Sequence, residues 1–360
     1  MKAKTTTHIF SPEQGSLPEF HVIISVEDAS LSYRDQLYAV IEACKEASLE
    51  RTVHFRRFFL SDAQNQASLL EKALQELPEA PTSIVQQEPL DGTRIAAWLY
   101  CTASMGVSHN GYSHYWTGSI TSPGQDSYAQ MHGIFTCLDK SLGANGMSVA
   151  GNTVRTWIFA RDVDVNYAGV VAGRRDYFNG IGLTHSTHFI ASTGIEGRHP
   201  DCNCLVEMDA YSIVGLKEGQ LEYLYALDHL SPTSHYGVTF ERGAMVTYGD
   251  RRHVFISGTA SIDAQGKVVH EGDAAAQTGR LLENISALLD EAGAGMPDIA
   301  MAIVYLRDTA DYPAVKSFLS KRCPTLNPLY VHAPVCRPAW LVEMECIAIT
   351  PAGNKQYPDF

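Results

Sequence analysis

The stretch 341–346 reads LVEMEC, and the stretch 205–210 reads LVEMDA. In each, acidic residues alternate with apolar ones, a pattern typical of a β-strand whose two faces meet different surroundings. Two such similar strands in one chain of 360 residues indicate an internal repeat.

The same order of elements precedes both stretches. A helix with one apolar face begins at Gln277 in one case and at Gln130 in the other. The strand after the helix ends in an Arg-Asp pair, at 307–308 or at 161–162, and a second helix follows each pair. These shared features identify two copies of one structural unit.

A third, weaker copy precedes these two. Its first helix begins at Gln36, and a strand at 53–60, a second helix around Leu69 and a final strand at 94–100 follow in the same order. The pair of strands that opens the unit is reduced here to a single apolar stretch at 20–24. We interpret this segment as a degenerate copy.

Each full unit opens with a pair of strands. In the last copy, the strand 253–260 leads through a turn at 263–267 into the strand 268–270. The unit order is therefore ββαβαβ, an α+β arrangement with helices on one face of a mixed sheet. The other sheet face still has apolar side chains to bury, so we expect three sheets packed together, with the helices outside.

The repeats divide the chain into a degenerate unit at 1–108, a second unit at 109–230 and a C-terminal unit at 231–360. Because each sheet needs the others to cover it, these units are not expected to fold as independent domains. The sequence predicts an intramolecular pseudo-trimer, present as a monomer or as a homo-oligomer of it.

Composition excludes several classes of function. The 27 Lys and Arg residues against 40 Asp and Glu give a net charge of −13, which disfavours binding to nucleic acid or to anionic membranes. No run of 18 apolar residues predicts a membrane span, and no apolar segment follows the basic N-terminus as in a signal peptide. The eight cysteines are scattered rather than arranged as a disulfide framework. We therefore expect a cytoplasmic protein.

Glu343 is the first candidate for chemistry. Alternation along the last strand places Glu343 and Glu345 on one face. Such a carboxyl group is either solvated, paired with an arginine, or buried in a pocket that raises its pKa, as a general acid requires. Glu207 is its partner in the second unit and marks a second candidate site, whereas the first unit has Ala97 there.

Arg155 alternates with Trp157 and Phe159 on one strand face. An unpaired guanidinium is costly to bury, so Arg155 is expected either to pair with an internal carboxylate or to bind the carboxylate of a ligand. The internal candidates are Asp162, Asp164, Glu207 and Glu343. The next candidates for a ligand carboxylate are Arg174 and Arg337.

Cys336 stands beside Arg337, whose charge favours the thiolate, in a segment where flanking prolines oppose regular strand pairing. We expect Cys336 to belong to a site without acting as a covalent nucleophile; a small buried residue is the alternative. Gly258 and Thr259 lie in a stretch of small polar residues. Such a stretch lets a ligand approach the backbone, or else permits close strand packing.

One segment has a composition similar to that of metal sites: His185, His188, His199, Cys202 and Cys204. The Cys-x-Cys spacing is not the usual one, and the histidines are loosely spaced. The segment between 186 and 205 contains Gly and Pro and is expected to be a loop. We therefore predict neither a metal ion nor a cofactor.

The repeats resemble the RidA/YjgF superfamily. The likeness is strongest in the last unit, in VFISGTASI at 254–262, GDAAAQT at 272–278, VYLRD at 304–308 and CRPAWLVEMECIAI at 336–349. Members of this superfamily usually form homotrimers of single units, with ligand pockets in the clefts between them. The resemblance implies that this chain is a covalent version of such a trimer.

The resemblance offers two chemistries. RidA deaminases hydrolyse small enamines and imines, and Glu343 falls on their glutamate, but Pro328 occupies the place of their carboxylate-binding arginine. Chorismatases, which are similar fused chains, cleave the enolpyruvyl ether of chorismate. The stretches SGTASI, VHEGD and LVEME look similar to that branch, as do Arg155, Trp157, Tyr167 and Arg174 and the seven-residue spacing of Cys336 and Glu343.

The resemblance thus implies a cofactor-free enzyme that hydrolyses a small carboxylated enol ether, enamine or imine. Glu343 would act as general acid, Arg155, Arg174 and Arg337 would hold carboxylates, and Tyr167 would hydrogen-bond the ligand. One alternative is a metabolite-binding or regulatory protein without catalysis. Endoribonuclease or translation-inhibitor activity, a label that this family sometimes carries, fits poorly with the charge of −13.

Overall fold

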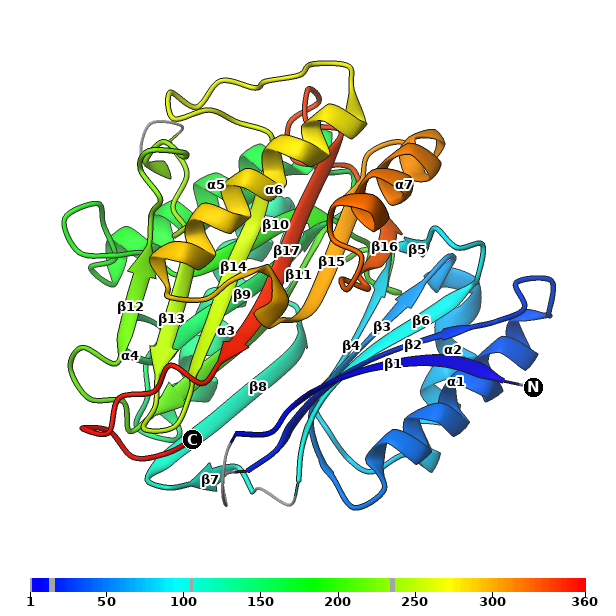
Figure 1. Ribbon diagram of the computed structural model, residues 1–360, viewed down its shortest axis with the longest axis horizontal. Helices are drawn as coiled ribbons and strands as arrows, with labels where there is room; N and C mark the ends of the chain where they lie inside the picture. Colours follow the sequence, from blue (N-terminus) through cyan, green and yellow to red (C-terminus); the bar gives the residue numbers. More distant parts are fainter. Residues whose placement is uncertain (1, 13–16, 104–105, 234–236) are drawn as a thin grey trace.

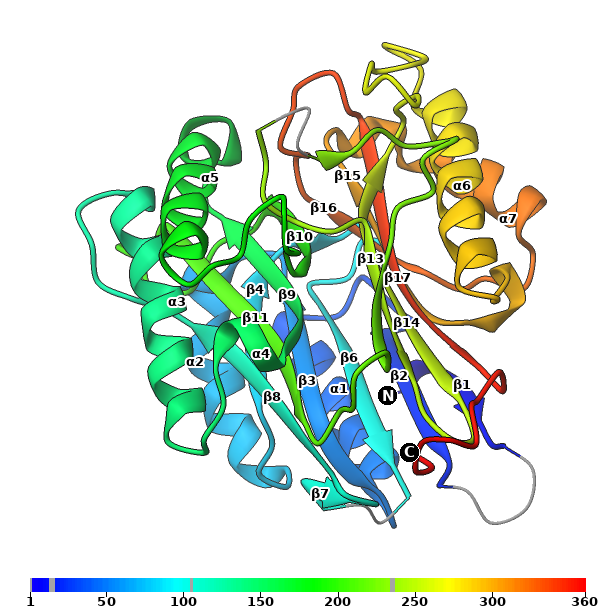
Figure 2. The same ribbon diagram turned by 90° about the vertical axis from the view of Figure 1, so that its left-hand side faces the viewer.

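Three mixed β-sheets pack around a common centre, and the helices cover their outer faces (Figures 1 and 2). The computed structural model describes residues 2–12, 17–103, 106–233 and 237–360. Among these residues, no helix combines the length and apolar character needed to cross a membrane.

The first sheet has the strand order β1-β2-β6-β3-β4. Its elements are β1 (Ala3–Phe10), β2 (Glu19–Val26), α1 (Tyr33–Ser48), β3 (Thr52–Leu60), α2 (Ala63–Ala73), β4 (Thr82–Gln86) and β6 (Ile95–Thr102). The short β5 (Glu88–Pro89) leaves this unit and pairs at the edge of the third sheet.

The second sheet has the order β7-β8-β11-β9-β10. Its elements are β7 (Ser108–His109), β8 (Tyr112–Ile120), α3 (Ser127–Gly143), α4 (Val149–Asn152), β9 (Thr153–Ala160), α5 (Val163–Gly180), β10 (Ala191–Glu196) and β11 (Val206–Val214).

The third sheet has the order β12-β13-β14-β17-β15-β16-β5. Its elements are β12 (Leu221–Leu224), β13 (Gly243–Thr247), β14 (Arg252–Ala260), α6 (Ala274–Glu291), β15 (Ile299–Leu306), α7 (Tyr312–Arg322), β16 (Leu329–His332) and β17 (Val342–Thr350). β12 extends this sheet although it lies before residue 231.

The shared strand order confirms the predicted α+β pseudo-trimer. In each sheet a hairpin is followed by the last strand of the unit (β6, β11 or β17), then by the strand between the two helices (β3, β9 or β15), and then by a strand parallel to it. That parallel strand, β4, β10 or β16, is absent from the predicted ββαβαβ order. The segment between 186 and 205, expected to be a loop, contains β10. Its small residues, Ala-Ser-Thr-Gly, lack the apolar alternation that marks a strand.

Two predictions about hairpins are wrong. In the third unit, the hairpin partner of β14 is the preceding strand β13, and residues 268–270 take part only through an isolated bridge from Val268 to Ile262. In the first unit the hairpin is complete, because the Thr-rich β1 pairs with β2 along its whole length. β1 was missed because it is polar and mostly exposed.

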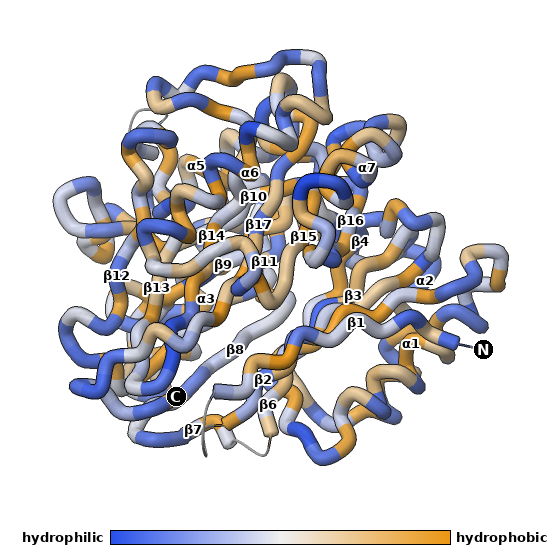
Figure 3. The backbone as a smooth tube through the Cα atoms, in the orientation of Figure 1, coloured by the Kyte–Doolittle hydropathy of each residue, from blue (hydrophilic) through white to orange (hydrophobic). Residues whose placement is uncertain are grey.

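The apolar residues form one central cluster and smaller ones beneath the outer helices. The central cluster includes residues from all three units, among them Trp98, Trp157 and Phe255. Separate clusters join each of the first two sheets to its own helices. Figure 3 shows hydrophobic residues along the strands and mainly hydrophilic ones in the outer loops. The centre is therefore built by the units together.

A buried glutamine explains why each unit has Gln at the start of its first helix. The side chain of Gln277 donates to the carbonyl of Ala339 at 2.9 Å and accepts from the backbone N–H of Leu341 at 2.9 Å. Gln130 makes the matching bonds to Asn203 and Leu205. Gln36 accepts from the backbone N–H of Arg94 but donates to the carbonyl of Leu31, just before its own helix. The amide thus ties the helix start to the start of the last strand of its unit.

Replacing Gln277 with Ala should therefore destabilise the protein. Its side chain also donates to the carbonyl of His270, so the substitution leaves several backbone groups without their partner. We expect a loss of about 2 to 4 kcal/mol in the free energy of unfolding, measured by urea denaturation. Gln265→Ala, in an exposed turn, is the control and should change it by less than about 0.5 kcal/mol. Equal effects of the two substitutions would contradict this role.

Candidate active site

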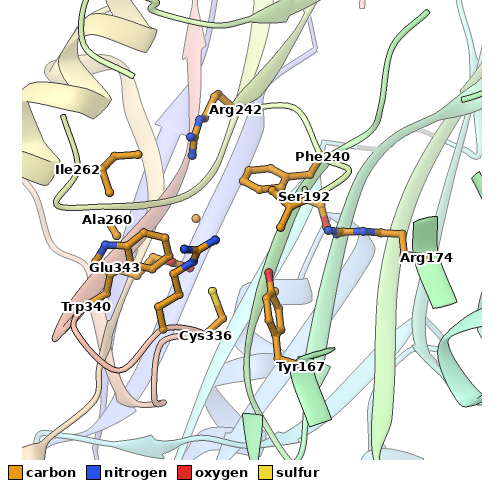
Figure 4. Close-up of a pocket in the computed structure, with 14 residues that line it drawn as sticks. Tyr167, Arg174, Ser192, Phe240, Arg242, Ala260, Ile262, Cys336, Trp340 and Glu343 are labelled. Carbon is orange, nitrogen blue, oxygen red and sulfur yellow. The ribbon is translucent and has the colours of Figure 1, made fainter. Parts of the chain in front are cut away.

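A hollow lies between the second and third units (Figure 4). Together with the solvent at its mouth, it comprises about 570 Å³ of space outside the protein atoms. Its walls come from α5 and β10 of one unit and from β14, β17 and the segments 238–242 and 336–340 of the other. The lining residues are Tyr167, Arg174, Ser192, Gly194, Val238, Phe240, Arg242, Gly258, Ala260, Ile262, Cys336, Arg337, Trp340 and Glu343.

Glu343 forms part of the wall on the β17 side. Its side chain is 5% exposed, and no hydrogen-bond donor reaches it from the described part of the chain. Burial, and then the charge of Glu345, raise the pKa of Glu343 to about 8. Glu343 is therefore mainly a neutral carboxylic acid at pH 7, with a proton to donate.

Gly258 makes room for this carboxyl group. A Cβ atom at position 258 would lie 2.2 Å from the Oε1 of Glu343 and 3.0 Å from the Cγ2 of Thr193. A side chain at position 258 would displace the carboxyl group of Glu343 from this position, so the glycine on β14 leaves the space that this group occupies. The adjacent Thr259, also predicted to bind ligand, is not among the lining residues; its hydroxyl donates to the carbonyl of Ser257.

Arg174 brings a positive charge to the opposite wall from α5. Its Nε donates to the hydroxyl of Thr239 at 3.0 Å, and its Nη1 lies 3.4 Å from the hydroxyl of Ser192. Its Nη2 is buried without a partner, and no carboxylate in the described part of the chain faces the group. A buried guanidinium in this state is suited to a ligand carboxylate.

Tyr167 and Cys336 lie between these two walls. In Figure 4 the hydroxyl group of Tyr167 points into the hollow, beside the thiol of Cys336. Burial, and then the charge of Glu343, raise the pKa of Cys336 to about 12. Arg337 acts in the expected direction and lowers the pKa of Cys336, but burial outweighs its charge, so the thiol stays protonated. Burial also raises the pKa of Tyr167 well above its usual value.

Several lining residues were not identified from the sequence. Arg242 enters from above in Figure 4, and its guanidinium lies 5.4 Å from the ring of Phe240. The alternation of an aromatic residue with an arginine at 240–242 resembles that of Arg155 and Trp157 and was the available signal. Val238, Ile262 and Trp340 add apolar walls, with Arg337 stacked 5.3 Å from the ring of Trp340. The hollow thus combines basic groups with an apolar interior.

Arg155 is not among the residues that line the hollow. Its Nη2 lies 2.7 Å from the Oε2 of Glu345, and both side chains are about 1% exposed. The internal ion pair is therefore realised, but none of the four expected carboxylates is the partner. Glu345 lies on β17, two residues after the expected Glu343, and alternation along the strand does not distinguish which of the two faces Arg155.

The cleft that holds Glu207 is closed. The carbonyl of Thr82 on β4 would lie 2.5 Å from a Cβ atom at Gly118, and the hydroxyl of Ser119 bonds both Glu207 and the backbone of Ile84. The Oε1 of Glu207 has no partner, and burial raises its pKa well above the usual value. Backbone from the first unit thus fills the space that a ligand would need.

The first unit has an alanine at the matching position, but one residue earlier than predicted. Glu343 pairs with Tyr305, Glu207 with Phe159, and Ala96 with Phe59, at the same place in each sheet. The predicted Ala97 faces the helices instead, because strand residues alternate between faces. In the described part of the chain, His, Cys, Asp and Glu residues nowhere form a group able to hold a metal ion.

Comparison with known proteins agrees with this architecture. A family model described as Endoribonuclease L-PSP matches residues 244–350. The 3-aminoacrylate deaminase RutC of Acinetobacter baylyi is 37% identical over 97 residues, which are 26% of this chain and 77% of that protein.

A crystal structure of chorismatase covers 93% of this chain and 100% of its own, with a TM-score of 0.65 and 17% identity. At this level of identity the likeness concerns the fold. The chain belongs to the Endoribonuclease L-PSP family of the RidA superfamily, as a fused form with the fold of chorismatase.

Proposed function

We propose that the hollow is the active site of a cofactor-free hydrolase that acts on a small carboxylated enol ether of the chorismate type. The observation that carries this proposal is that Glu343 and Arg174 lie on opposite walls of the same hollow. Glu343 is a neutral acid at pH 7, because its pKa is raised to about 8, and Arg174 is a buried cation with a free donor. A proton donor opposite a carboxylate-binding group is what hydrolysis of an enolpyruvyl ether requires.

The reaction would proceed in three steps. The carboxyl group of Glu343 protonates the terminal methylene carbon of the enol ether, which leaves an oxocarbenium ion at the ether carbon. Water adds to that carbon and gives its proton back to Glu343, forming a hemiketal. Collapse of the hemiketal releases pyruvate and the alcohol, so one water is consumed and no electrons are transferred.

The remaining lining residues would bind the substrate. Arg174 would hold one carboxylate, while Arg242 and Arg337 would add positive charge around the ring or side arm of the substrate. Tyr167 would donate a hydrogen bond to a substrate oxygen. Cys336 would lie against the substrate as a neutral thiol, because its raised pKa opposes formation of the thiolate nucleophile.

A second candidate function is hydrolysis of a small enamine or imine. The identity with RutC, a 3-aminoacrylate deaminase, favours it, and Glu343 would again supply the proton. Binding of a carboxylated metabolite without turnover is the third outcome, and it would make the protein a regulatory binder.

The first test is turnover of chorismate by the purified protein, with pyruvate measured through lactate dehydrogenase. Glu343→Gln keeps the shape of the side chain but has no proton to donate, so kcat should fall by about 100-fold or more. Glu207→Gln is the matched control, since Glu207 occupies the same position in the closed cleft and should leave kcat unchanged. No pyruvate from chorismate, together with hydrolysis of 3-aminoacrylate or 2-iminopropionate, would favour the second candidate.

The rate should also depend on pH in one direction. Glu343 must be protonated to act, and its pKa in the folded protein is about 8. We expect kcat to be constant on the acid side of this value and to fall as the pH rises through it. A rate that increases with pH through 8 would instead require Glu343 as a general base.

Arg174→Met should lower kcat/KM by about 10- to 100-fold, because a charged hydrogen bond to the substrate carboxylate is lost. The control is Arg175→Met, since the adjacent Arg175 is exposed on the same helix and pairs with Asp176 at the surface. Equal kinetics for the two variants would remove Arg174 from the proposed site.

A further inference from the structure

We propose that Glu345 is a positioning residue for this site: its carboxylate, fixed where the three sheets meet, keeps the neighbouring Glu343 in the proton-donating form. The importance of this coupling for catalysis rests on the proposed function. Its physical content, a coupling between two carboxyl groups on one strand, can be measured without any substrate.

Glu345 is surrounded by hydrogen-bond donors. Its Oε1 accepts from the indole N–H of Trp157 at 3.0 Å and from the hydroxyl of Tyr305 at 2.9 Å. Its Oε2 accepts from Arg155 at 2.7 Å and from the hydroxyl of Thr193. Both oxygens are thus occupied as acceptors, which is the arrangement that an ionised carboxylate takes.

Glu343 has the opposite environment on the same strand face. It lies two residues before Glu345, and no donor from the described part of the chain hydrogen-bonds to it. A second negative charge beside an anionic Glu345 is unfavourable in a buried setting, so the proton stays on Glu343. Of the two carboxyl groups, Glu345 is therefore the ionised one and Glu343 the protonated one.

Other charged and titratable groups also face Glu343. They come from β9, from α5 and from the segments before β13 and before β17: Arg155, Tyr167, Arg242 and Cys336, with Arg174 and Arg337 further around the hollow. Burial and Glu345 both raise the pKa of Glu343, and burial is the larger cause. The positive charges of Arg242 and Arg155 lower it. Loss of the Glu345 charge should therefore lower, but not abolish, the rise in the pKa of Glu343.

The first unit takes part through Arg57. Arg57 lies 2.7 Å from Asp209 of the second unit and 3.9 Å from Glu345 of the third. This unit has no glutamate at the position of Glu343, yet it contributes a positive charge that stabilises the anionic form of Glu345. The degenerate unit would thus act on the chemistry of a cleft that it does not line.

Hydrogen bonds also connect Glu345 to the strand segment beside Glu343. The hydroxyl of Thr193 donates to Glu345 and accepts from the backbone N–H of Gly258 at 2.9 Å. Gly258 in turn lies directly against the carboxyl group of Glu343. Glu345 therefore also fixes, through Thr193, the strand segment that positions Glu343.

The experiment is a carbon-13 NMR titration of the protein labelled at the glutamate carboxyl carbons, with Glu343→Gln used to assign the resonance of Glu343. In the Glu345→Gln variant the pKa of Glu343 should fall by about one unit or more from its value near 8. Glu345→Asp keeps the charge and should retain the raised pKa. If chorismate is a substrate, the alkaline limb of kcat should move down by the same amount in Glu345→Gln.

The matched control is Glu19→Gln. Glu19 is another fully buried carboxylate among dense donors, 2.6 Å from Arg251 and 2.6 Å from Tyr100, but it does not face Glu343. Its replacement should leave the titration of Glu343 in place. An unchanged pKa in Glu345→Gln, or an equal fall in Glu19→Gln, would overturn the proposal.

A second variant covers the case in which Glu345→Gln does not fold. Replacing both Arg155 and Glu345, by Met and Gln, removes the two charges together, which proteins often tolerate. Glu345 outweighs Arg155 in its effect on Glu343, so the pKa of Glu343 should still fall. Because the titration needs no substrate, its outcome remains valid even if chorismate and the imines are not turned over.

Discussion

Four buried charges meet where the three sheets face one another. Arg57 lies on β3, Arg155 on β9, Asp209 on β11 and Glu345 on β17, so every sheet contributes. Removing such groups from water is costly, and only close opposite charges and hydrogen bonds offset that cost. The charges can be satisfied only when all three units are assembled, and the same condition applies to the tryptophans around them. This shared centre ties the fold of each unit to the others.

Fusion into one chain allows the clefts between units to differ while the centre is kept. A glutamate remains at Glu343 and Glu207, but β4 closes the cleft at Glu207, whereas Thr193 and Gly258 leave space beside Glu343. The first unit has Ala96 at this position and supplies Arg57 to the centre instead. The repeats thus have the same strand order but different roles: the first unit stabilises the buried centre, and the third supplies the acid of the open cleft. A homotrimer of identical units cannot make this division.

The repeats and most of the helices and strands follow from local pattern, because apolar alternation and helical periodicity are properties of short segments. The parallel strand β10 and the polar β1 were missed because they lack this local pattern. Their residues show little apolar alternation, and their partners in the sheet determine their structure. The hairpin of the third unit was assigned to the wrong side of β14 because a Gly-containing turn follows that strand in sequence, whereas β13 has only a short apolar run.

The sequence by itself determined that this protein is a threefold repeat and that Glu343 and Glu345 share one face of a strand. Only the tertiary structure decided what those two carboxyl groups meet. Arg242 acts on Glu343, Arg174 lies on the opposite wall of the hollow, and Arg155 pairs with Glu345 rather than with a ligand. These contacts join different units across sheet faces, and no local periodicity encodes how one sheet is placed on another. The surroundings of a charge set its protonation, so the chemistry of the site depends on that placement.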